Sequence, residues 1–253
     1  MDVKAYRQPD LVAVLLSGGL DSTTALHIAL DKTGLLDVNP NLVHAISFDY
    51  AQRHASKELE VAGDTCDDLG ITHHILDLSA VIPDSMLTNP NKEIPDIGYE
   101  DIEGVSPTYV PFRNGLMMSA ATSHVVGLLD SIANPSNGYE PIAHLYCGIH
   151  SDDAAGFAYP DCTPEFFGSA ANMIYTGTYG RVRLIAPLLW MDKSEIITRG
   201  DELGVDFGGT WSCYKGGAVH CGSCPTCRAR RKGFIDADVN DPTDYESLPP
   251  LAG

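Results

Sequence analysis

Basic residues are scarce in this sequence: 16 lysines and arginines stand against 34 aspartates and glutamates, for a formal net charge of -18 over 253 residues. A surface with this charge repels phosphate backbones and anionic lipids, so we expect neither a nucleic acid nor a membrane as a partner. Apolar runs long enough to span a bilayer are missing, and the first residues lack a signal-peptide pattern. These absences predict a cytoplasmic protein.

Internal repeats are also missing, and a chain of 253 residues with 44% hydrophobic and 20% charged content is typical of one soluble domain with its own core. Short apolar runs alternate with segments of helical period, which is typical of a parallel sheet covered by helices. The expected strands are 11–16, 42–48, 72–76, 144–147 and 181–185, and the expected helices are 21–31, 56–69, 115–129 and 193–203.

This pattern predicts an α/β fold with a doubly wound, mostly parallel sheet. A long loop rich in Pro, Asn, Asp and Gly is expected up to Pro107, and loops of that length are commonly functional. The acidic tail from Asp236 onward is expected to be a surface extension.

A glycine-containing loop, Ser17-Gly18-Gly19-Leu20-Asp21-Ser22, joins the first expected strand to the first expected helix. Two glycines let the backbone turn tightly and approach a ligand, and the helix N-terminus offers unpaired N–H groups to an anion. The same residues also suit a plain strand-to-helix turn, with Asp21 as a helix cap instead of a Mg²⁺ ligand. The candidate nucleotide-binding residues are Leu16, Ser17, Gly18, Gly19, Leu20, Asp21, Ser22, Thr23, Thr24, Ala25 and Leu26.

This loop resembles the SGGxDS signature of the PP-loop enzymes, the N-type ATP pyrophosphatases, and it lacks the lysine of a Walker A loop. The resemblance implies an adenine nucleotide alpha hydrolase-like fold. It also implies ATP and Mg²⁺ as cofactors, with cleavage between the α and β phosphates.

Four of the seven cysteines crowd into a C-x7-C-x2-C-x2-C run made of Cys213, Cys221, Cys224 and Cys227. The short gaps let four thiolates converge on one tetrahedral ion, and such a closed shell leaves no position for water. We expect one structural Zn²⁺ per chain, with an iron–sulfur cluster or a redox pair of Cys224 and Cys227 as alternatives. The basic run 228–232 is expected to be a solvated helix face or a phosphate contact. The remaining cysteines are expected to fill the core: Cys66, Cys147 and Cys162.

Further segments together resemble the QueC family of 7-cyano-7-deazaguanine synthases over nearly the whole chain. The matching segments are 48–54 (FDYAQRH), 109–114 (YVPFRN), 159–166 (YPDCTPEF), 186–188 (APL) with Lys193, and 212–214 (SCY) ahead of CGSCPTC. Ala51 and Phe112 stand where glycine is common in the family. We expect both departures to be conservative for the fold and to alter the shape of the pocket.

The resemblance implies an ATP-dependent ligase that converts 7-carboxy-7-deazaguanine and ammonia to the nitrile 7-cyano-7-deazaguanine (preQ0) in queuosine biosynthesis, acting as a homodimer. The residues implied in catalysis are Asp21, Arg113 and Lys193. Those implied in substrate binding are Asp49, Tyr50, Gln52, Arg53, His54, Tyr109, Arg113, Asn114, Asp161 and Glu165. The chain then divides into a PP-loop catalytic domain at 1–204 and a small zinc-binding subdomain at 205–253.

Two other functions stay open at this point. A tRNA-thiolating PP-loop enzyme would use the same adenylation, but it needs an RNA-binding surface and reactive cysteines, and the acidic composition disfavours it. A nucleotide-sensing module would keep the ATP loop without a substrate pocket, and the segments around Asp49, Arg113 and Asp161 disfavour that function.

Overall fold

The computed structural model describes residues 7–134, 136, 138–150, 152–154 and 158–248. Five parallel strands form one sheet in the order β3-β2-β1-β4-β5. The strands are β1 (Leu11–Leu15), β2 (Val43–Asp49), β3 (Thr72–Asp77), β4 (Ala143–Tyr146) and β5 (Val182–Ile185). The predicted α/β fold with a parallel sheet is confirmed.

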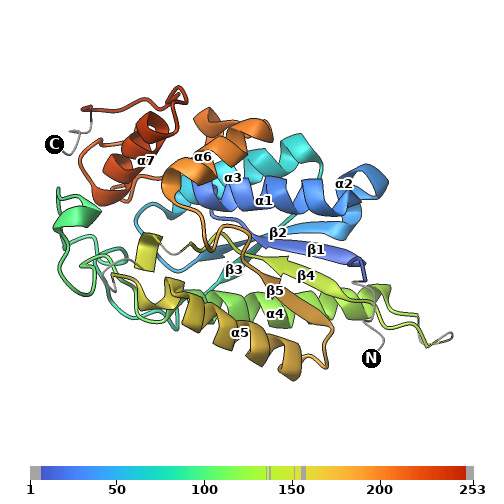
Figure 1. Ribbon diagram of the computed structural model, residues 1–253. Helices are drawn as coiled ribbons and strands as arrows, with labels where there is room; N and C mark the ends of the chain where they lie inside the picture. The colour runs from blue at the N-terminus through green and yellow to red at the C-terminus, as the bar shows by residue number, and fades with distance from the viewer. Residues whose placement is uncertain (1–6, 135, 137, 151, 155–157, 249–253) are drawn as a thin grey trace.

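Helices cover both faces of this sheet (Figure 1). One layer holds α1 (Leu20–Thr33), α2 (Leu35–Val38), α3 (Ala55–Leu69) and α6 (Lys193–Glu202), and the other holds α4 (Arg113–Ile132) and α5 (Pro164–Gly177). Helix α7 (Pro225–Asp236) packs on α6 beyond the carboxyl ends of the strands. Short 3-10 turns lie at Pro40–Leu42, Tyr99–Asp101, Pro160–Cys162 and Phe207–Gly209. Among the described helices, none combines the length and the hydropathy needed to cross a membrane.

The two faces of β1 contribute to two separate cores, because successive strand residues point to opposite sides of a sheet. Leu11 and Ala13 pack in the core that includes residues of α4 and α5, while Val12 and Val14 pack in the core that includes residues of α1 and α3. All four side chains are buried. Burial on both faces explains why this strand is a continuous apolar run in the sequence.

The order of the strands creates a crevice between β1 and β4. From β1, the chain extends the sheet to one side with β2 and β3, and to the other side with β4 and β5. The connections after β1 and β4 lead to helices on opposite faces, and ligands of open α/β sheets bind where such connections diverge. The predicted phosphate loop follows β1, so the topology places it at this crevice.

Two long helices, α5 and α7, were not among the elements predicted from periodicity. The Thr163 hydroxyl caps α5 by accepting a hydrogen bond from the Phe166 N–H at 3.2 Å, and Pro164 occupies a first-turn position that needs no N–H donor. Helix α7 likewise begins with a proline, Pro225, after Cys224. A proline directly after a cap residue was the available sequence signal for a helix start.

The C-terminal tail covers the cysteine-rich turn. The His220 N–H donates to the Asp244 carbonyl at 3.2 Å, the Glu246 N–H donates to the His220 carbonyl at 2.8 Å, and Ser247 Oγ donates to the Cys221 carbonyl at 3.0 Å. The described part of the tail is exposed or half-buried, as expected of a surface segment, and these hydrogen bonds anchor it over the cysteines. Its last residues, 249–253, lie outside the described residues.

Ala51 and Phe112 both adopt left-handed backbone, with φ of 61° and 57°. A Cβ in this region crowds the following carbonyl oxygen and costs about 1–2 kcal/mol, which is why glycine is favoured there. Each departure from the family pattern therefore adds backbone strain, while β2 ahead of Ala51 and α4 after Phe112 are still formed.

Candidate active site

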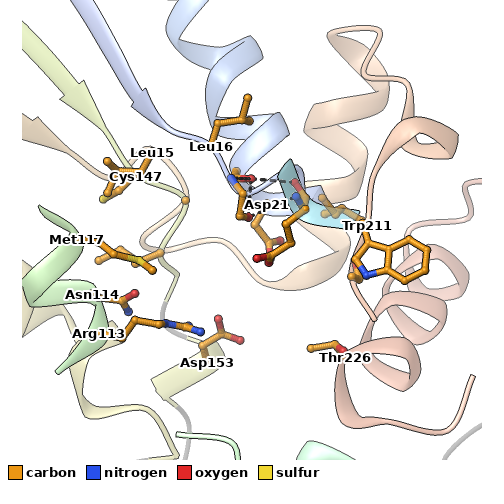
Figure 2. A pocket seen from close by; sticks show the side chains of 18 of the residues that line it. Leu15, Leu16, Asp21, Arg113, Asn114, Met117, Cys147, Asp153, Trp211 and Thr226 are labelled. Carbon is orange, nitrogen blue, oxygen red and sulfur yellow. Dashed lines mark hydrogen bonds between the residues drawn. The ribbon is translucent and has the colours of Figure 1, made fainter. Parts of the chain in front are cut away.

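One pocket lies at the crevice between β1 and β4 (Figure 2). It is lined by residues of the sheet-forming part of the chain and by residues of the C-terminal part around the cysteines. Arg113 and Asn114 of α4 lie on one side, Trp211 and Thr226 of the C-terminal part lie on the other, and Asp21 lies between them. The pocket therefore depends on segments that are more than a hundred residues apart in the sequence.

The phosphate loop has the form that an anion site requires. Gly18 has a φ of +73°, and a Cβ at this position would lie 2.9 Å from the Glu58 carbonyl oxygen, so only glycine fits. Ser22 Oγ accepts a hydrogen bond from the Ser17 N–H at 3.2 Å and donates to the Gly19 carbonyl at 3.1 Å, which closes the loop. The N-cap residue of α1, Gly19, has no side chain that could cap the helix, so the first N–H groups of this helix can face a ligand.

Asp21 and Lys193, two of the predicted catalytic residues, meet beside this loop. Lys193 Nζ lies 2.7 and 2.8 Å from the two carboxylate oxygens of Asp21 and 3.2 Å from His150 Nε2. His150 is buried after β4, and its Nε2 also lies 3.4 Å from a carboxylate oxygen of Asp153. A capping box, formed by Asp192 with a residue one turn later, fixes the start of α6 and with it the position of Lys193. The structure thus joins α1, α6 and the loop after β4 through charged groups.

These groups determine one another's protonation. Burial acts to raise the pKa of Asp21, but Lys193 and His150 outweigh it, so this pKa lies well below its ordinary value. Burial acts to lower the pKa of Lys193, but Asp21 and Asp153 outweigh it, so this pKa lies above its ordinary value. Asp21 is therefore a carboxylate and Lys193 an ammonium at neutral pH.

Arg113, the third predicted catalytic residue, lies on the wall formed by α4. Its Nη1 donates to the Tyr50 hydroxyl at 3.0 Å, and the guanidinium carbon lies 5.8 Å from the centre of the Tyr50 ring. Burial raises the pKa of Tyr50 to about 12, so the phenol stays neutral. No described carboxylate lies within ion-pair distance of Arg113. An anionic ligand would supply the missing counter-charge.

The predicted residues divide into those that line the pocket and those that do not. The lining residues are Leu16, Ser17, Gly19, Leu20, Asp21, Ser22, Tyr50, Arg113, Asn114 and Lys193. The predicted residues that lie off the wall are Gly18, Thr23, Thr24, Ala25, Leu26, Asp49, Gln52, Arg53, His54, Tyr109, Asp161 and Glu165.

Several of the predicted residues that do not line the pocket support the segments that do. Arg53 Nη2 donates to three backbone carbonyls of the loop after β3, those of Met86, Asn89 and Lys92. Asp161 accepts a hydrogen bond from the Asn114 N–H at 3.0 Å, next to the arginine that begins α4. These contacts give Arg53 and Asp161 supporting positions in this structure.

Sequence reasoning missed several pocket residues because no motif marks them. They come from the loop before α4, the loop after β4 and the segment before the cysteines: Tyr99, Asp153 and Trp211. His150 does not line the pocket itself, but it contacts Lys193 and Asp153, which do. Arg230 was considered in the sequence only as a member of the basic run 228–232. The interpretation of that run as a solvated helix face is wrong for Arg230, which is 2% exposed and lines the pocket.

The four predicted metal ligands come together in the fold. The Sγ atoms of Cys213, Cys221, Cys224 and Cys227 all lie within 4.8 Å of one another, and all four residues are buried. Cys221 Sγ accepts hydrogen bonds from the N–H groups of Ser223 at 3.4 Å and Cys224 at 3.3 Å, and such donors stabilise thiolates. This donor set fits a tetrahedral metal ion with no position for water.

Trp211 connects this cysteine cluster to the phosphate loop. Its backbone N–H donates to the Gly18 carbonyl at 2.8 Å, and its indole Nε1 donates to the Cys213 carbonyl at 2.8 Å. The indole also lies on the His220 ring, with centres 4.5 Å apart. One residue thus contacts both the metal-binding turn and the loop that faces the pocket.

Comparison with known proteins identifies the family. The family described as "Queuosine biosynthesis protein QueC" matches residues 11–238. The chain is 39% identical over 238 residues to the 7-cyano-7-deazaguanine synthase of Alteromonas mediterranea, covering 93% of this chain and 98% of that relative. It is 39% identical over 237 residues to the enzyme of the same name from Caldicellulosiruptor bescii, covering 92% and 96%.

Among solved structures, similarity is lower. The U34-tRNA thiolase NcsA from Methanococcus maripaludis, solved with its 4Fe-4S cluster, matches 92% of this chain and 66% of its own, with 17% identity and a TM-score of 0.49. Similarity at that level has no bearing on function. The family match over nearly the whole chain, together with the two relatives, shows that this protein belongs to the QueC family.

Proposed function

We propose that the protein is an ATP-dependent 7-cyano-7-deazaguanine synthase, a ligase that forms carbon–nitrogen bonds. Besides membership of the QueC family, this proposal rests on one observation. A single pocket is lined by the phosphate loop, Lys193 and Arg113, and the charge of Arg113 has no described carboxylate partner. The loop suits the phosphates of a nucleotide, and Arg113 suits the carboxylate of a second ligand. Activation of a carboxylate by ATP requires two such anions side by side.

The reaction removes both oxygens of the substrate carboxylate. A carboxylate oxygen first attacks the α-phosphorus of ATP, and pyrophosphate leaves. Ammonia then attacks the carbonyl carbon and loses a proton, while AMP departs with that oxygen to leave an amide. The amide oxygen attacks a second ATP in the same way. Loss of both N–H protons and departure of a second AMP give the nitrile.

The charged residues have separate roles in this scheme. Departure of pyrophosphate builds negative charge, which the Lys193 ammonium beside the loop would stabilise, since fixed charges act strongly in a partly dry site. Arg113 would orient the carboxylate. Asp21 is the residue that we propose to hold Mg²⁺, because a carboxylate suits a hard cation and the ion would neutralise phosphate charge.

We propose that the ion at the four cysteines is zinc, one per chain, with a structural role. Four buried thiolates suit Zn²⁺, and ATP already supplies the activation that a catalytic metal would otherwise supply. The ion would hold the turn that carries Trp211 and α7 to the pocket.

The pocket thiols disfavour the alternative of a tRNA-thiolating enzyme. Burial raises the pKa of Cys147 to about 12 and raises that of Cys162 well above its ordinary value. Both thiols therefore stay protonated at neutral pH, whereas sulfur transfer needs a thiolate. The net charge of -18 also opposes RNA binding.

The proposal is tested by incubating the purified protein with ATP, Mg²⁺, ammonium and 7-carboxy-7-deazaguanine. Mass spectrometry should detect the nitrile, with one AMP formed for each oxygen removed. If the substrate carboxylate carries ¹⁸O, the label should appear in AMP. Label in free phosphate would indicate an acyl phosphate, and failure to form either amide or nitrile would overturn the proposal.

A homodimer, ammonia as the nitrogen source and a cytoplasmic location complete the proposal. The first two follow from the family resemblance, and the location follows from the composition and the first residues of the sequence. Light scattering of the purified protein tests the dimer. Replacement of ammonium by glutamine in the assay tests the nitrogen source, because activity should then be lost.

A further inference from the structure

Arg230 is a cation buried within the C-terminal part of the chain, where its side chain is 2% exposed. Four hydrogen bonds hold its guanidinium, to Thr243 Oγ1 at 2.7 Å, Thr210 Oγ1 at 2.8 Å, Ser212 Oγ at 3.1 Å and the Phe207 carbonyl at 2.7 Å. The position of the charge is therefore fixed before any ligand binds.

None of these four acceptors carries a charge. No described carboxylate lies within ion-pair distance of Arg230, although the chain as a whole has more than twice as many acidic as basic residues. A guanidinium stays protonated at every physiological pH. Asp241 and Asp21 act on this charge only from beyond ion-pair distance. Burial of a charge without a direct counter-charge is unfavourable, and hydrogen bonds to neutral oxygens offset part of that cost. An anion bound nearby would offset more of it.

The fold places this charge beside the phosphate loop. Arg230 lines the pocket together with Thr226 and Ala229, which share one face of α7. Its acceptor Ser212 directly follows Trp211, whose N–H donates to the Gly18 carbonyl at 2.8 Å. Figure 2 shows Trp211 and Thr226 on the side of the pocket that faces Asp21.

We propose that Arg230 is a positioning residue of the nucleotide site, whose fixed charge strengthens binding of the polyphosphate group. It acts through its electric field and through Ser212 and Trp211, because four of its five N–H groups are engaged by protein oxygens. This inference rests on the proposed function and extends it, since it gives the C-terminal part a role in phosphate affinity as well as in metal binding.

Two substitutions separate the charge from the hydrogen bonds. Arg230→Met removes the charge, Arg230→Lys keeps it, and both lose the planar fork, so both should lower the thermal stability. The affinity for Mg²⁺-pyrophosphate, measured by calorimetry, should fall about tenfold or more in Arg230→Met and less than about threefold in Arg230→Lys. The affinity for adenosine, which carries no phosphate, should be unchanged in both. If Arg230→Met does not fold, Arg230→Gln replaces it, because glutamine is neutral and can still donate to Thr210 or Thr243.

Two further variants serve as controls. Thr243→Ala removes one acceptor and keeps the charge, so it should lower stability without weakening pyrophosphate binding. Lys232→Met removes an exposed charge from the same helix and should leave pyrophosphate binding unchanged. If the affinity for pyrophosphate falls equally in Arg230→Met and Arg230→Lys, or falls in neither, the inference is overturned. Arg230 would then have only a structural role. A wild-type protein that binds neither ATP nor pyrophosphate would overturn the proposed function and this inference with it.

Discussion

Among single residues, Asp21 and Lys193 show how the site is prepared for its ligands. In the structure each is the other's partner, with Nζ within 2.8 Å of both carboxylate oxygens, and the pair is only partly exposed. Phosphate oxygens would give Lys193 a new partner, and Mg²⁺ would give one to Asp21. We expect nucleotide binding to exchange one set of charge contacts for another, so that neither charge is left buried and unpaired.

Asp21→Asn should fold and should lose at least about a hundredfold in turnover, because it removes a negative charge beside the phosphate loop while it preserves side-chain size. Circular dichroism and the rate of nitrile formation at saturating Mg²⁺ measure the two effects. Asp31→Asn is the matched control on the same helix, since it removes an exposed partner of Arg199 and should keep the wild-type rate. A near-wild-type rate for Asp21→Asn would remove this residue from the site.

Ala51→Gly should raise the free energy of unfolding by about 1 kcal/mol, because the backbone at this position has a φ of 61° and glycine adopts that region without strain. Urea unfolding measures the change. Gly34→Ala is the reverse substitution and serves as the control. Gly34 also has a φ of 61°, and a Cβ added there would meet nothing within 4 Å. This variant should therefore be destabilised by a similar amount. Lower stability of Ala51→Gly would mean that methyl contacts outweigh the strain.

Among elements, three histidines join β2, β3 and α4. His44 Nδ1 lies 3.0 Å from His74 Nε2, and the His74 ring meets the His124 ring edge-on, with centres 4.5 Å apart. Burial, and then the charges that His74 and His124 can carry, lowers the pKa of His44 to about 4. The contact between β2 and β3 at His44 therefore depends on a neutral His44 imidazole.

Protonation of this cluster should destabilise the fold. The pKa of His44 is lower in the folded protein than in the unfolded chain, so the unfolded state binds more protons between about pH 4 and about pH 6.5. The contribution of His44 is fully present above about pH 6.5 and is lost as the pH falls toward about 4. Between about pH 7 and about pH 5, the urea midpoint of the wild type should fall more than that of His44→Phe. An equal fall in both proteins would show that other groups govern the pH dependence.

For the whole molecule, the main feature is that one pocket belongs to two parts of the chain. The sheet contributes the phosphate loop and the start of α4, while the segment around the cysteines contributes Trp211, Thr226 and Arg230. The tail then packs over the cysteine turn through the contacts of Ser247 and Glu246. We therefore expect metal binding, packing of the tail and nucleotide affinity to be lost together.

Cys224→Ser should reduce the bound zinc from one ion per chain and should lower solubility and thermal stability, because structural metal binding is coupled to folding. Elemental analysis and thermal unfolding measure these effects, and activity should fall with the folded fraction. Cys66→Ala is the control, since Cys66 is buried in the core between α3 and the sheet and should not change the metal content. Iron in the wild-type protein, with visible absorbance, would show that the ion is not structural zinc.

The sequence by itself was sufficient for features that depend on neighbouring residues. The strand β1, the phosphate loop and helix α1 were predicted because an apolar run, two glycines and a helical period act over a few residues. The four cysteines were identified as one site because their short spacing forces the thiolates together. Asp21 and Lys193 were both named as catalytic, but their direct contact could not be predicted, since 172 residues separate them.

The tertiary structure alone decided which side chains are buried and which of them meet. Arg230 was expected in solvent because it stands in a basic run, yet it is buried against segments that are distant from α7 in the sequence. The acidic tail is at the surface, as expected, but its contacts with the cysteine turn could not be predicted. Asp153 and Trp211 carry no motif, and they became pocket residues because the order of the strands brings the loop after β4 and the cysteine segment to the same edge of the sheet. An apolar run predicts that a strand is buried, but which distant segment packs on a given side chain is not contained in the local pattern.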